Sequence, residues 1–517
     1  MIRNRMKKII WLLLFVLVSF FTFVACANDD SDAYEENGYE ENGDNNEDDD
    51  NGDEDENGDD NGDAENDYAE LNGDGDGDAD VGPHGFPLIQ LTDASRDIAL
   101  EDFEYLAELM LENVPSQVVV ERRFGAPLED ILDFMRDSIV NMDPIESLHF
   151  IIMGEEYPTG ELPTEDLEIA ADYLSSLLLW LTIDLQGLGH LSPQTLEGFA
   201  EMLEIHLALL HQMEIVDGRM MVNDEDQGSA ESLPWLESRA DAFSAEASLW
   251  FYGMTLDDID LYRDMEDFGF REEGNVTTEV IEEGRIGHIH IESFMNNRAF
   301  DSEVLFPFYE EIQDFDHLII DVRGNAGGTL AYVNYIIPML IDEPLEATYH
   351  EFLMAGDLIT QELEDGAAVT DEDEFADVMP ASDFVKEEEF PYFISEDLDI
   401  LEYVVTWPLT YEPRDDNIPF EGEIWLLVDG ESASLSELLA MIAIDSGFAT
   451  VVGEPTAGIT PTLHVYISLP NTGIVYRMDV GYIIDSQGRS IEEHGVIPDI
   501  VIEPGDDALD IVLELIE

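Results

Sequence analysis

Cysteine and basic side chains are scarce in this chain. Its 517 residues include one cysteine and 19 Lys and Arg against 121 Asp and Glu, which gives a formal net charge of -102. A single cysteine excludes any disulfide bond within the chain. A protein this acidic repels the phosphates of nucleic acid, so we expect no nucleic-acid partner. The length exceeds what one hydrophobic core usually holds, so we expect two or more folded units.

A mostly apolar run stands at the start of the chain. Residues 9–24 follow a short basic stretch, a pattern that is typical of a signal peptide and short for a membrane span. Cys26 ends the run in the sequence Phe-Val-Ala-Cys, which resembles a bacterial lipobox with phenylalanine in place of the usual leucine. We therefore expect residues 1–26 to be a signal peptide and a lipid on Cys26 to anchor the protein to the cell membrane, facing outside the cytoplasm. An ordinary secretory signal with an incidental cysteine is the alternative.

Residues 27–82 hold too few apolar side chains to build a core. They contain runs such as NNEDDDNGDEDENGDDNGD, and a segment of this composition is expected to be disordered. Because its charges repel one another, it would extend and hold the folded part away from the membrane. A calcium-binding repeat is the alternative, but the EF-hand spacing with its closing glutamate is not cleanly present.

Helical periodicity marks the next part of the chain. We expect a small helical domain over residues 83–215, followed by an irregular insertion or lid over residues 216–275. Apolar residues recur three and four positions apart in four segments, at 102–115, 128–142, 164–185 and 192–213.

The pattern changes at about Val276 to strands that alternate with helices, which predicts an α/β fold. His288 and His290 alternate with apolar residues on one expected strand, so we interpret them as packing residues and not as a metal pair. Strands are expected at 285–291, 317–323, 424–428, 450–452, 462–469 and 473–480, with helices at 302–315 and 329–341.

A glycine-rich stretch lies between an expected strand and an expected helix. Gly324, Gly327 and Gly328 occupy this position, which is the usual context of an anion-binding turn. No Gly-Lys-Ser or Gly-Lys-Thr follows, as a phosphate loop requires. We therefore favour an oxyanion-binding role over nucleotide binding.

Ser434 is the candidate nucleophile. It follows the strand at 424–428 and a tight turn, and a helix begins within the sequence ESASLSE. A serine in this place is exposed at the sheet edge, close to free backbone N–H groups that can stabilise an oxyanion. The alternative is helix capping, because Ser434 and Glu437 have the S-x-x-E spacing of a capping box. The residues around Ser434, taken alone, favour the helix-capping role.

Five motifs then occur in a fixed order along the chain: GRIGHIHIESF, LIIDVRGNAGG, LLVDGESASLSE, VVGEPTAG and EEHGVIPDIVI. In that order and spacing they resemble the peptidase core of the C-terminal-processing (tail-specific) protease family. The resemblance implies a crotonase/ClpP-like core over residues 276–517, made of a mixed β-sheet with flanking helices. It also implies a serine-type peptidase that needs neither metal nor cofactor. The family's nucleophile is the middle serine of the S-x-S-x-S-E string, here Ser434.

The resemblance also locates the other catalytic groups. The better-known branch of the family carries a lysine where this chain has Ile459, and Lys386 is the only lysine after the signal peptide. The tricorn-like branch instead uses a histidine from the preceding domain and a glutamate ahead of the G-V-x-P-D motif. These residues correspond to His190, as the base, and Glu492, as the group that orients or stabilises the imidazole directly or through a bridging group. The serine before the histidine in tricorn is Gly189 here.

Several alternatives to this arrangement stay open. His149, His464 and His494 are rival bases, and His464 follows the GEPTAG loop closely. The oxyanion hole is expected to combine the backbone N–H of Leu435 with that of Gly327 or Gly328.

The expected protein is thus a lipid-anchored, extracytoplasmic serine endopeptidase that hydrolyses a peptide or protein substrate through an acyl-enzyme. The alternative is a catalytically weak peptide- or ligand-binding lipoprotein on the same fold, for which Ile459 and Gly189 argue.

Overall fold

The structure is a computed structural model, and its elements lie in the compact unit Asp80–Glu517. The predictions for the signal peptide, for Cys26, for Gly189 and for nearly all of the acidic tether fall outside the described residues. The structure describes residues 81–153, 164–185, 190–196, 242–252, 274–295, 298–328, 330–358, 377–386, 389–414, 416–462, 464–503 and 505–517, with short pieces between 199 and 229.

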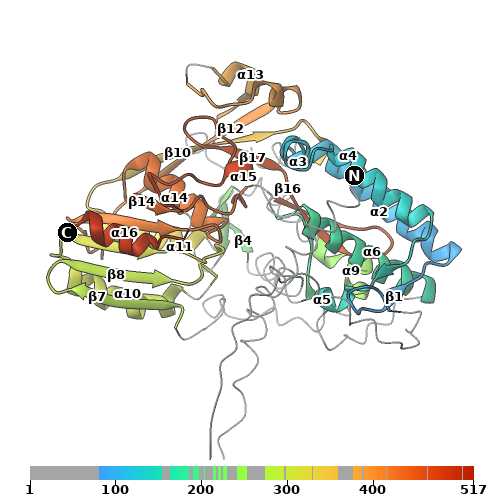
Figure 1. Cartoon of the computed structure of the whole chain (residues 1–517), viewed down its shortest axis with the longest axis horizontal. Helices are drawn as coiled ribbons and strands as arrows, with labels where there is room; N and C mark the ends of the chain where they lie inside the picture. Colours follow the sequence, from blue (N-terminus) through green and yellow to red (C-terminus); the bar gives the residue numbers. More distant parts are fainter. Residues whose placement is uncertain are drawn as a thin grey trace, which may run out of the picture. The chain divides into compact units, whose positions relative to one another are not determined.

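A six-stranded mixed sheet forms the centre of the C-terminal part (Figure 1). Four of its strand pairs are parallel, and only the edge pair β7–β8 is antiparallel. The predicted α/β fold with a mixed sheet and flanking helices is therefore confirmed. In sheet order the strands are β18 (Ile500–Val501), β14 (Thr450–Gly453), β13 (Glu423–Val428), β9 (His317–Asp321), β8 (Ile286–Ile291) and β7 (Val276–Glu282).

Both faces of this sheet are covered, which explains why its strands read as continuous apolar runs. Successive side chains of a strand point to opposite faces. In β9, Leu318 and Ile320 pack with α10 (Arg298–Ile312), α11 (Leu330–Leu340) and α14 (Leu435–Ser446), whereas Ile319 packs on the other face against α16 (Ala508–Leu515).

Two smaller antiparallel sheets adjoin the centre, and most of their strands were not predicted. The first has the order β11 (Asp377–Pro380), β12 (Tyr403–Tyr411), β10 (Leu345–Leu353) and β17 (Gly481–Ile484). The second has the order β15 (His464–Ser468), β16 (Val475–Asp479) and β3 (Ser192–Pro193). β15 and β16 fall within the two strands that were expected at 462–469 and 473–480.

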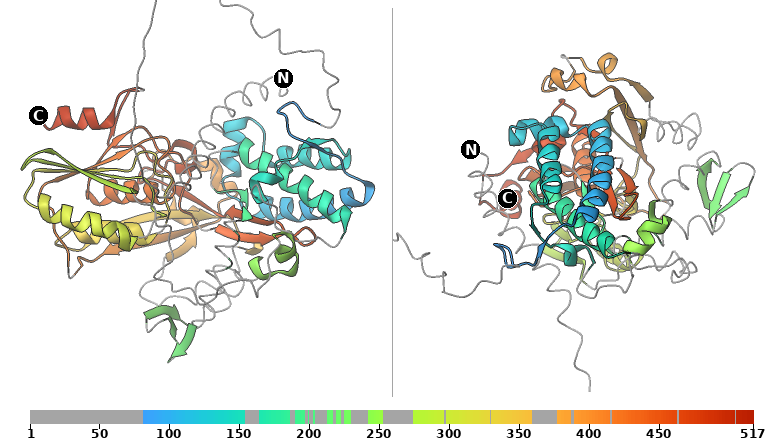
Figure 2. Two further views of the ribbon diagram at one scale, coloured as in Figure 1. Left: turned by 90° about the horizontal axis from the view of Figure 1, so that it is seen from below. Right: turned by 90° about the vertical axis from the view of Figure 1, so that its right-hand side faces the viewer.

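Helices dominate the described N-terminal part, and α2 packs against both α4 and α6 (Figures 1 and 2). Their apolar faces share one core with the hairpin β15–β16. The expected helix at 192–213 begins instead with strand β3, and most of its remainder is outside the described residues. The helices are α2 (Asp93–Asn113), α3 (Gln117–Phe124), α4 (Leu128–Val140), α5 (His149–Met153), α6 (Glu165–Asp184) and α9 (Glu246–Phe251).

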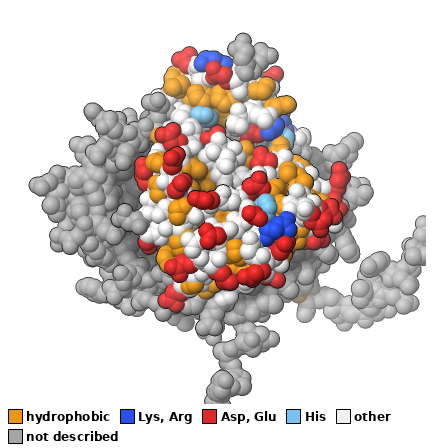
Figure 3. All heavy atoms as spheres, turned by 90° about the vertical axis from the view of Figure 1, so that its left-hand side faces the viewer, with side chains coloured by type: hydrophobic (Ala, Val, Ile, Leu, Met, Phe, Trp, Pro, Cys, Tyr) orange, Lys and Arg blue, Asp and Glu red, His pale blue; other side chains and the backbone are white. Residues whose placement is uncertain are grey.

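The remaining described elements are short. They are β1 (Leu88–Ile89), β2 (Ile145–Glu146), β4 (Met213–Val216), β5 (Arg219–Val222), β6 (Glu225–Ser229), α13 (Ala381–Phe384), the 3-10 helix η4 (Ser395–Asp399) and α15 (Ile491–His494). Within the described ranges, no helix has both the length and the apolar character that crossing a membrane requires. Figure 3 shows one face of the protein, over which acidic side chains are spread while Lys and Arg are few.

Candidate active site

Ser434 has an unusual backbone conformation. It lies between β13 and α14 with φ 53° and ψ -117°. Among the described residues, Met142 is the only other non-glycine residue with a positive φ. Such a conformation costs on the order of 1–3 kcal/mol and persists only where the surroundings impose it. A strained serine at a strand-to-helix turn is the geometry of a nucleophile elbow. Ser434 is only 8% exposed, so the expected exposure at the sheet edge is wrong.

The capping-box hypothesis for Ser434 and Glu437 is wrong. The Ser434 side chain makes no capping hydrogen bond, and the Ser434 backbone N–H donates to the carbonyl oxygen of Ile459 at 2.7 Å. Glu437 Oε1 instead accepts hydrogen bonds from Thr456 Oγ1 at 2.6 Å and from Gly458 N–H at 2.7 Å. The Ser434 hydroxyl is therefore not used to hold the helix.

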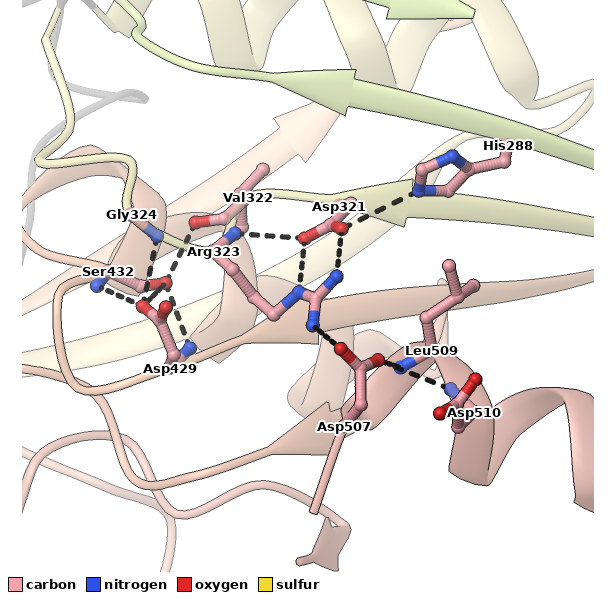
Figure 4. A network of polar contacts seen from close by, with 10 residues as sticks. All are labelled: His288, Asp321, Val322, Arg323, Gly324, Asp429, Ser432, Asp507, Leu509 and Asp510. Atoms are coloured by element: carbon pink, nitrogen blue, oxygen red, sulfur yellow. Dashed lines mark hydrogen bonds and ion pairs between the residues drawn. The ribbon is translucent and has the colours of Figure 1, made fainter. Parts of the chain in front are cut away.

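A carboxylate network holds the turn that carries Ser434 against the glycine-rich turn after β9 (Figure 4). Asp429 Oδ1 accepts hydrogen bonds from the backbone N–H groups of Gly324 and Ser432, both at 3.0 Å. Ser432 Oγ–H donates to the carbonyl oxygen of Val322 at 2.8 Å. These contacts fix two loops that are more than a hundred positions apart in the chain, and so they impose the conformation of Ser434.

A second part of the same network anchors the end of β9 (Figure 4). The Arg323 guanidinium donates to Asp321 Oδ2 at 2.7 Å, and His288 Nε2 lies 3.5 Å from that same oxygen. Burial acts to raise the pKa of Asp321, but His288 and Arg323 outweigh burial and hold this pKa well below its ordinary value. His288 thus pairs with a carboxylate. In the described ranges no group of three or more His, Cys, Asp and Glu could hold a metal ion.

The glycine-rich turn lies directly against the nucleophile. A Cβ atom on Gly327 would stand 2.7 Å from Ser434 Cβ and 2.8 Å from the backbone nitrogen of Leu435. The Gly327 N–H donates to Asn325 Oδ1 at 2.8 Å, so this donor is already engaged. Leu435 N–H, at the start of α14, and Gly328 N–H have no acceptor among the described residues. Of the two glycines named as alternatives, Gly328 therefore has the free donor.

His190 is held by a carboxylate that the sequence analysis missed. Asp479 Oδ2 accepts the backbone N–H of His190 at 2.5 Å and lies 3.0 Å from Nδ1 of its ring. Asp479 is the last residue of β16 and is 3% exposed. An acidic residue at a buried position of an apolar strand was the only signal in the sequence that could have indicated this residue.

Glu492 makes its hydrogen bonds to residues other than His190. Its Oε1 accepts from the Ile483 N–H at 3.0 Å and from Thr460 Oγ1 at 2.9 Å, and its Oε2 accepts from Ser490 Oγ at 3.0 Å. Burial raises the pKa of Glu492 to about 7, and burial likewise raises the pKa of Glu437 to about 7. The structure therefore pairs His190 with Asp479 and does not pair it with Glu492.

The described lysine and two of the rival histidines have other partners or are exposed. Lys386 Nζ is 3.7 Å from Glu389 Oε2, and its side chain is 57% exposed. His149 Nδ1 is 3.0 Å from Ser175 Oγ on α6, and His494 is exposed at the end of α15. His464 is different, because it is the register partner of Asp479 across β15 and β16.

Comparisons with known proteins agree with the motif order. Residues 285–502 match the model of peptidase family S41. A protein of Chlamydia pneumoniae is 23% identical over 207 residues, which are 36% of this chain and 33% of that protein. The chain thus spans about a third of the length of the curated relative that it matches.

The solved structures that match the chain are distant in sequence. A protein from Parabacteroides merdae, described as a candidate peptidase, is 15% identical with a TM-score of 0.41, covering 81% of this chain and 96% of that one. Mature CPAF complexed with lactacystin is 14% identical with a TM-score of 0.41, covering 79% of this chain and 94% of that one.

Proposed function

We propose that the protein is a serine endopeptidase that cleaves peptide or protein substrates through an acyl-enzyme, since residues 285–502 match the model of peptidase family S41. The observation that carries this proposal is the strained backbone of Ser434, whose hydroxyl has no hydrogen-bond partner in the described part of the chain. A structural serine would have used that hydroxyl in a cap or a turn.

The proposed reaction uses groups from three loops. The hydroxyl oxygen of Ser434 attacks the substrate carbonyl carbon while His190 takes the hydroxyl proton. The N–H groups of Leu435 and Gly328 stabilise the negative charge that develops on the carbonyl oxygen. His190 then gives the proton to the leaving amine, the peptide C–N bond breaks, and water hydrolyses the acyl-enzyme by the same steps.

We further propose that the protein is extracytoplasmic and attached to the membrane by a lipid on Cys26. This rests on the apolar run at residues 9–24 and on the lipobox-like sequence that ends in Cys26. Membrane and soluble fractions of cells that express the parent and Cys26→Ser test the anchor. The proposal predicts that the parent sediments with membranes and that Cys26→Ser is released in soluble form. Equal partition of both proteins would contradict it.

A binding protein that lacks strong catalysis is the second candidate, because the family lysine is replaced by Ile459. The two candidates differ in turnover. The full chain in detergent micelles is incubated with a peptide pool and the products are identified by mass spectrometry, beside Ser434→Ala and His190→Ala. Ser446→Ala is the matched control, since Ser446 lies at the opposite end of the same helix and, among the described residues, its hydroxyl bonds only the Ile442 carbonyl and the Phe448 N–H.

The peptidase proposal predicts the same cleavages for the parent and Ser446→Ala, and none for Ser434→Ala. It predicts a loss of about 100-fold or more for His190→Ala. If no protein of the set cleaves any peptide, the binding function is favoured.

A further inference from the structure

One carboxylate oxygen contacts His190 in two places. Asp479 Oδ2 accepts the backbone N–H of His190 and lies within hydrogen-bond distance of Nδ1 of the ring. Two contacts from one oxygen fix both the position of the residue and the orientation of its side chain. We propose that Asp479, and not Glu492, is the positioning residue that sets the orientation and the tautomer of the His190 base. This inference rests on the proposed function, in which His190 accepts the proton of Ser434.

The sheet β15–β16–β3 brings the two residues together although they are far apart in sequence. Strand β3, which follows His190 closely, pairs with β16 in the register Pro193 opposite Tyr476 and Ser192 opposite Arg477. The Gln194 N–H extends this pairing by donating to the Val475 carbonyl oxygen at 2.8 Å. The strand end at Asp479 therefore stands beside the segment that carries His190.

The chemistry of the pair determines which ring nitrogen is free. An ionised carboxylate only accepts hydrogen bonds, so the Nδ1 that faces Asp479 carries the proton and donates it. Nε2 is then unprotonated and can accept the hydroxyl proton of Ser434. Once the ring is doubly protonated, the negative charge of Asp479 stabilises the imidazolium.

Neighbouring basic side chains favour the ionised form of Asp479 that this role needs. Burial acts to raise the pKa of Asp479, but His190, Arg477 and His464 together hold it below its ordinary value. Arg477 Nε lies 4.0 Å from Asp479 Oδ1, and Oδ1 has no hydrogen bond within the described residues. The carboxylate thus directs one oxygen to the histidine and presents the other to a guanidinium.

Both carboxylate oxygens of Glu492 are engaged in hydrogen bonds that stabilise the fold. Its two oxygens accept hydrogen bonds from Ile483, Thr460 and Ser490, which tie strand β17 and helix α15 to the loop after the GEPTAG sequence. A carboxylate engaged in this way holds three chain segments together. Glu492 is therefore a structural residue, and Asp479 takes the orienting role that was expected of Glu492.

The kinetic test replaces Asp479 by its isosteric amide. Asp479→Asn should lower kcat by about 100- to 10,000-fold, because the amide can donate to Nδ1 and reverse the tautomer, while KM stays within about threefold. Asp102→Asn is the matched control, since Asp102 is also buried and bonds Asn471 and Thr472 at the other end of the same hairpin. It should change stability and leave kcat per folded molecule within about threefold. Equal losses of kcat in both variants would show a merely structural role.

The double variant His190→Ala/Asp479→Asn shows whether Asp479 affects kcat only through His190. If Asp479 works only through the histidine, the double variant should be within about threefold of His190→Ala alone. Losses that multiply across the two substitutions would overturn the inference.

A readout that needs no turnover keeps the inference separate from the proposed function. In the parent labelled with ¹⁵N-histidine, NMR should show the His190 ring with its proton on Nδ1 at neutral pH, and His190→Ala assigns the signal. If this signal is present but the parent cleaves no peptide, the peptidase proposal fails and the positioning role stands. If the proton is on Nε2, the inference is wrong even in an active peptidase.

Discussion

Glu437 Oε1 accepts the backbone N–H of Gly458 at 2.7 Å, which joins the first turn of helix α14 to the GEPTAG loop. One residue further along that loop, the Ile459 carbonyl oxygen accepts the N–H of Ser434. The loop is therefore tied to the helix on both sides of the nucleophile. Ile459 stands at the position of the family's lysine and contributes its backbone carbonyl. The loop therefore helps to position Ser434 although it has no lysine.

The first prediction concerns the pH dependence of stability. Burial raises the pKa of Glu437 from 4.5 to about 7, so the folded state holds this proton more tightly than the unfolded state does. The contribution to the free energy of unfolding is fully present below pH 4.5 and is lost as the pH rises through about 7. The loss amounts to about 3 kcal/mol at most. Glu437→Gln should remove it, because the amide cannot ionise.

Urea unfolding of the parent and of Glu437→Gln between pH 4 and pH 8 checks this prediction. The variant should be close to the parent in stability near pH 5 and more stable than the parent near pH 8. Parallel pH profiles for the two proteins would contradict the assigned cause. Glu492 has a pKa that burial also raises to about 7, so the pH profile of Glu437→Gln is expected to flatten only in part.

The second prediction compares two carboxylates as partners of the base. Glu492→Gln keeps an oxygen that can accept from Ile483 N–H and Thr460 Oγ1, so kcat should fall less than about 10-fold and far less than in Asp479→Asn. Steady-state kinetics of both variants on one peptide decide between them. A larger loss in Glu492→Gln would restore Glu492 as the orienting group.

The third prediction concerns the close contact at Gly327. Gly327→Ala would place a methyl group 2.7 Å from Ser434 Cβ at a residue with φ 94°, so activity should fall by about 100-fold or more as the oxyanion donors move apart. Gly324→Ala is the control, since Gly324 also has a positive φ but the nearest atom to its Cβ would be 4.0 Å away. It should lose about 1 kcal/mol of stability and keep its activity within about threefold. Similar activity losses in both variants would point to loop strain alone.

The fourth prediction follows from the strained backbone of Ser434. Ser434→Gly and Ser434→Ala both lack the hydroxyl and should both be inactive. Only glycine relieves the positive φ, so Ser434→Gly should be more stable than Ser434→Ala by about 1 kcal/mol. Thermal unfolding at one pH measures the difference. A less stable glycine variant would show that the turn is not strained.

Local sequence patterns predicted the elements that carry the nucleophile. The apolar run before Asp429 became strand β13, and the apolar stretch after Ser434 became helix α14. Burial on both faces of the sheet makes such strands easy to recognise, because few polar residues interrupt them. The order of the five motifs then indicated the C-terminal-processing protease family, and the model of peptidase family S41 matches residues 285–502.

The contacts that complete the site depend on residues far apart in the chain, and local patterns do not report them. His190 and Asp479 meet only because β3 pairs with β16. The S-x-x-E spacing of Ser434 and Glu437 was misleading for the same reason, since the GEPTAG loop from elsewhere in the chain takes the glutamate as its acceptor. A short spacing rule cannot anticipate a competing partner that only the fold supplies.

The most direct test of the central claim is the reaction of the full chain with an alkyl fluorophosphonate, followed by intact-mass measurement and peptide mapping. The serine oxygen displaces fluoride from phosphorus only where a base activates it. We expect one adduct, on Ser434, which is absent from Ser434→Ala and forms about 100-fold or more slowly in His190→Ala. An unmodified parent, or an adduct that persists in Ser434→Ala, would contradict it.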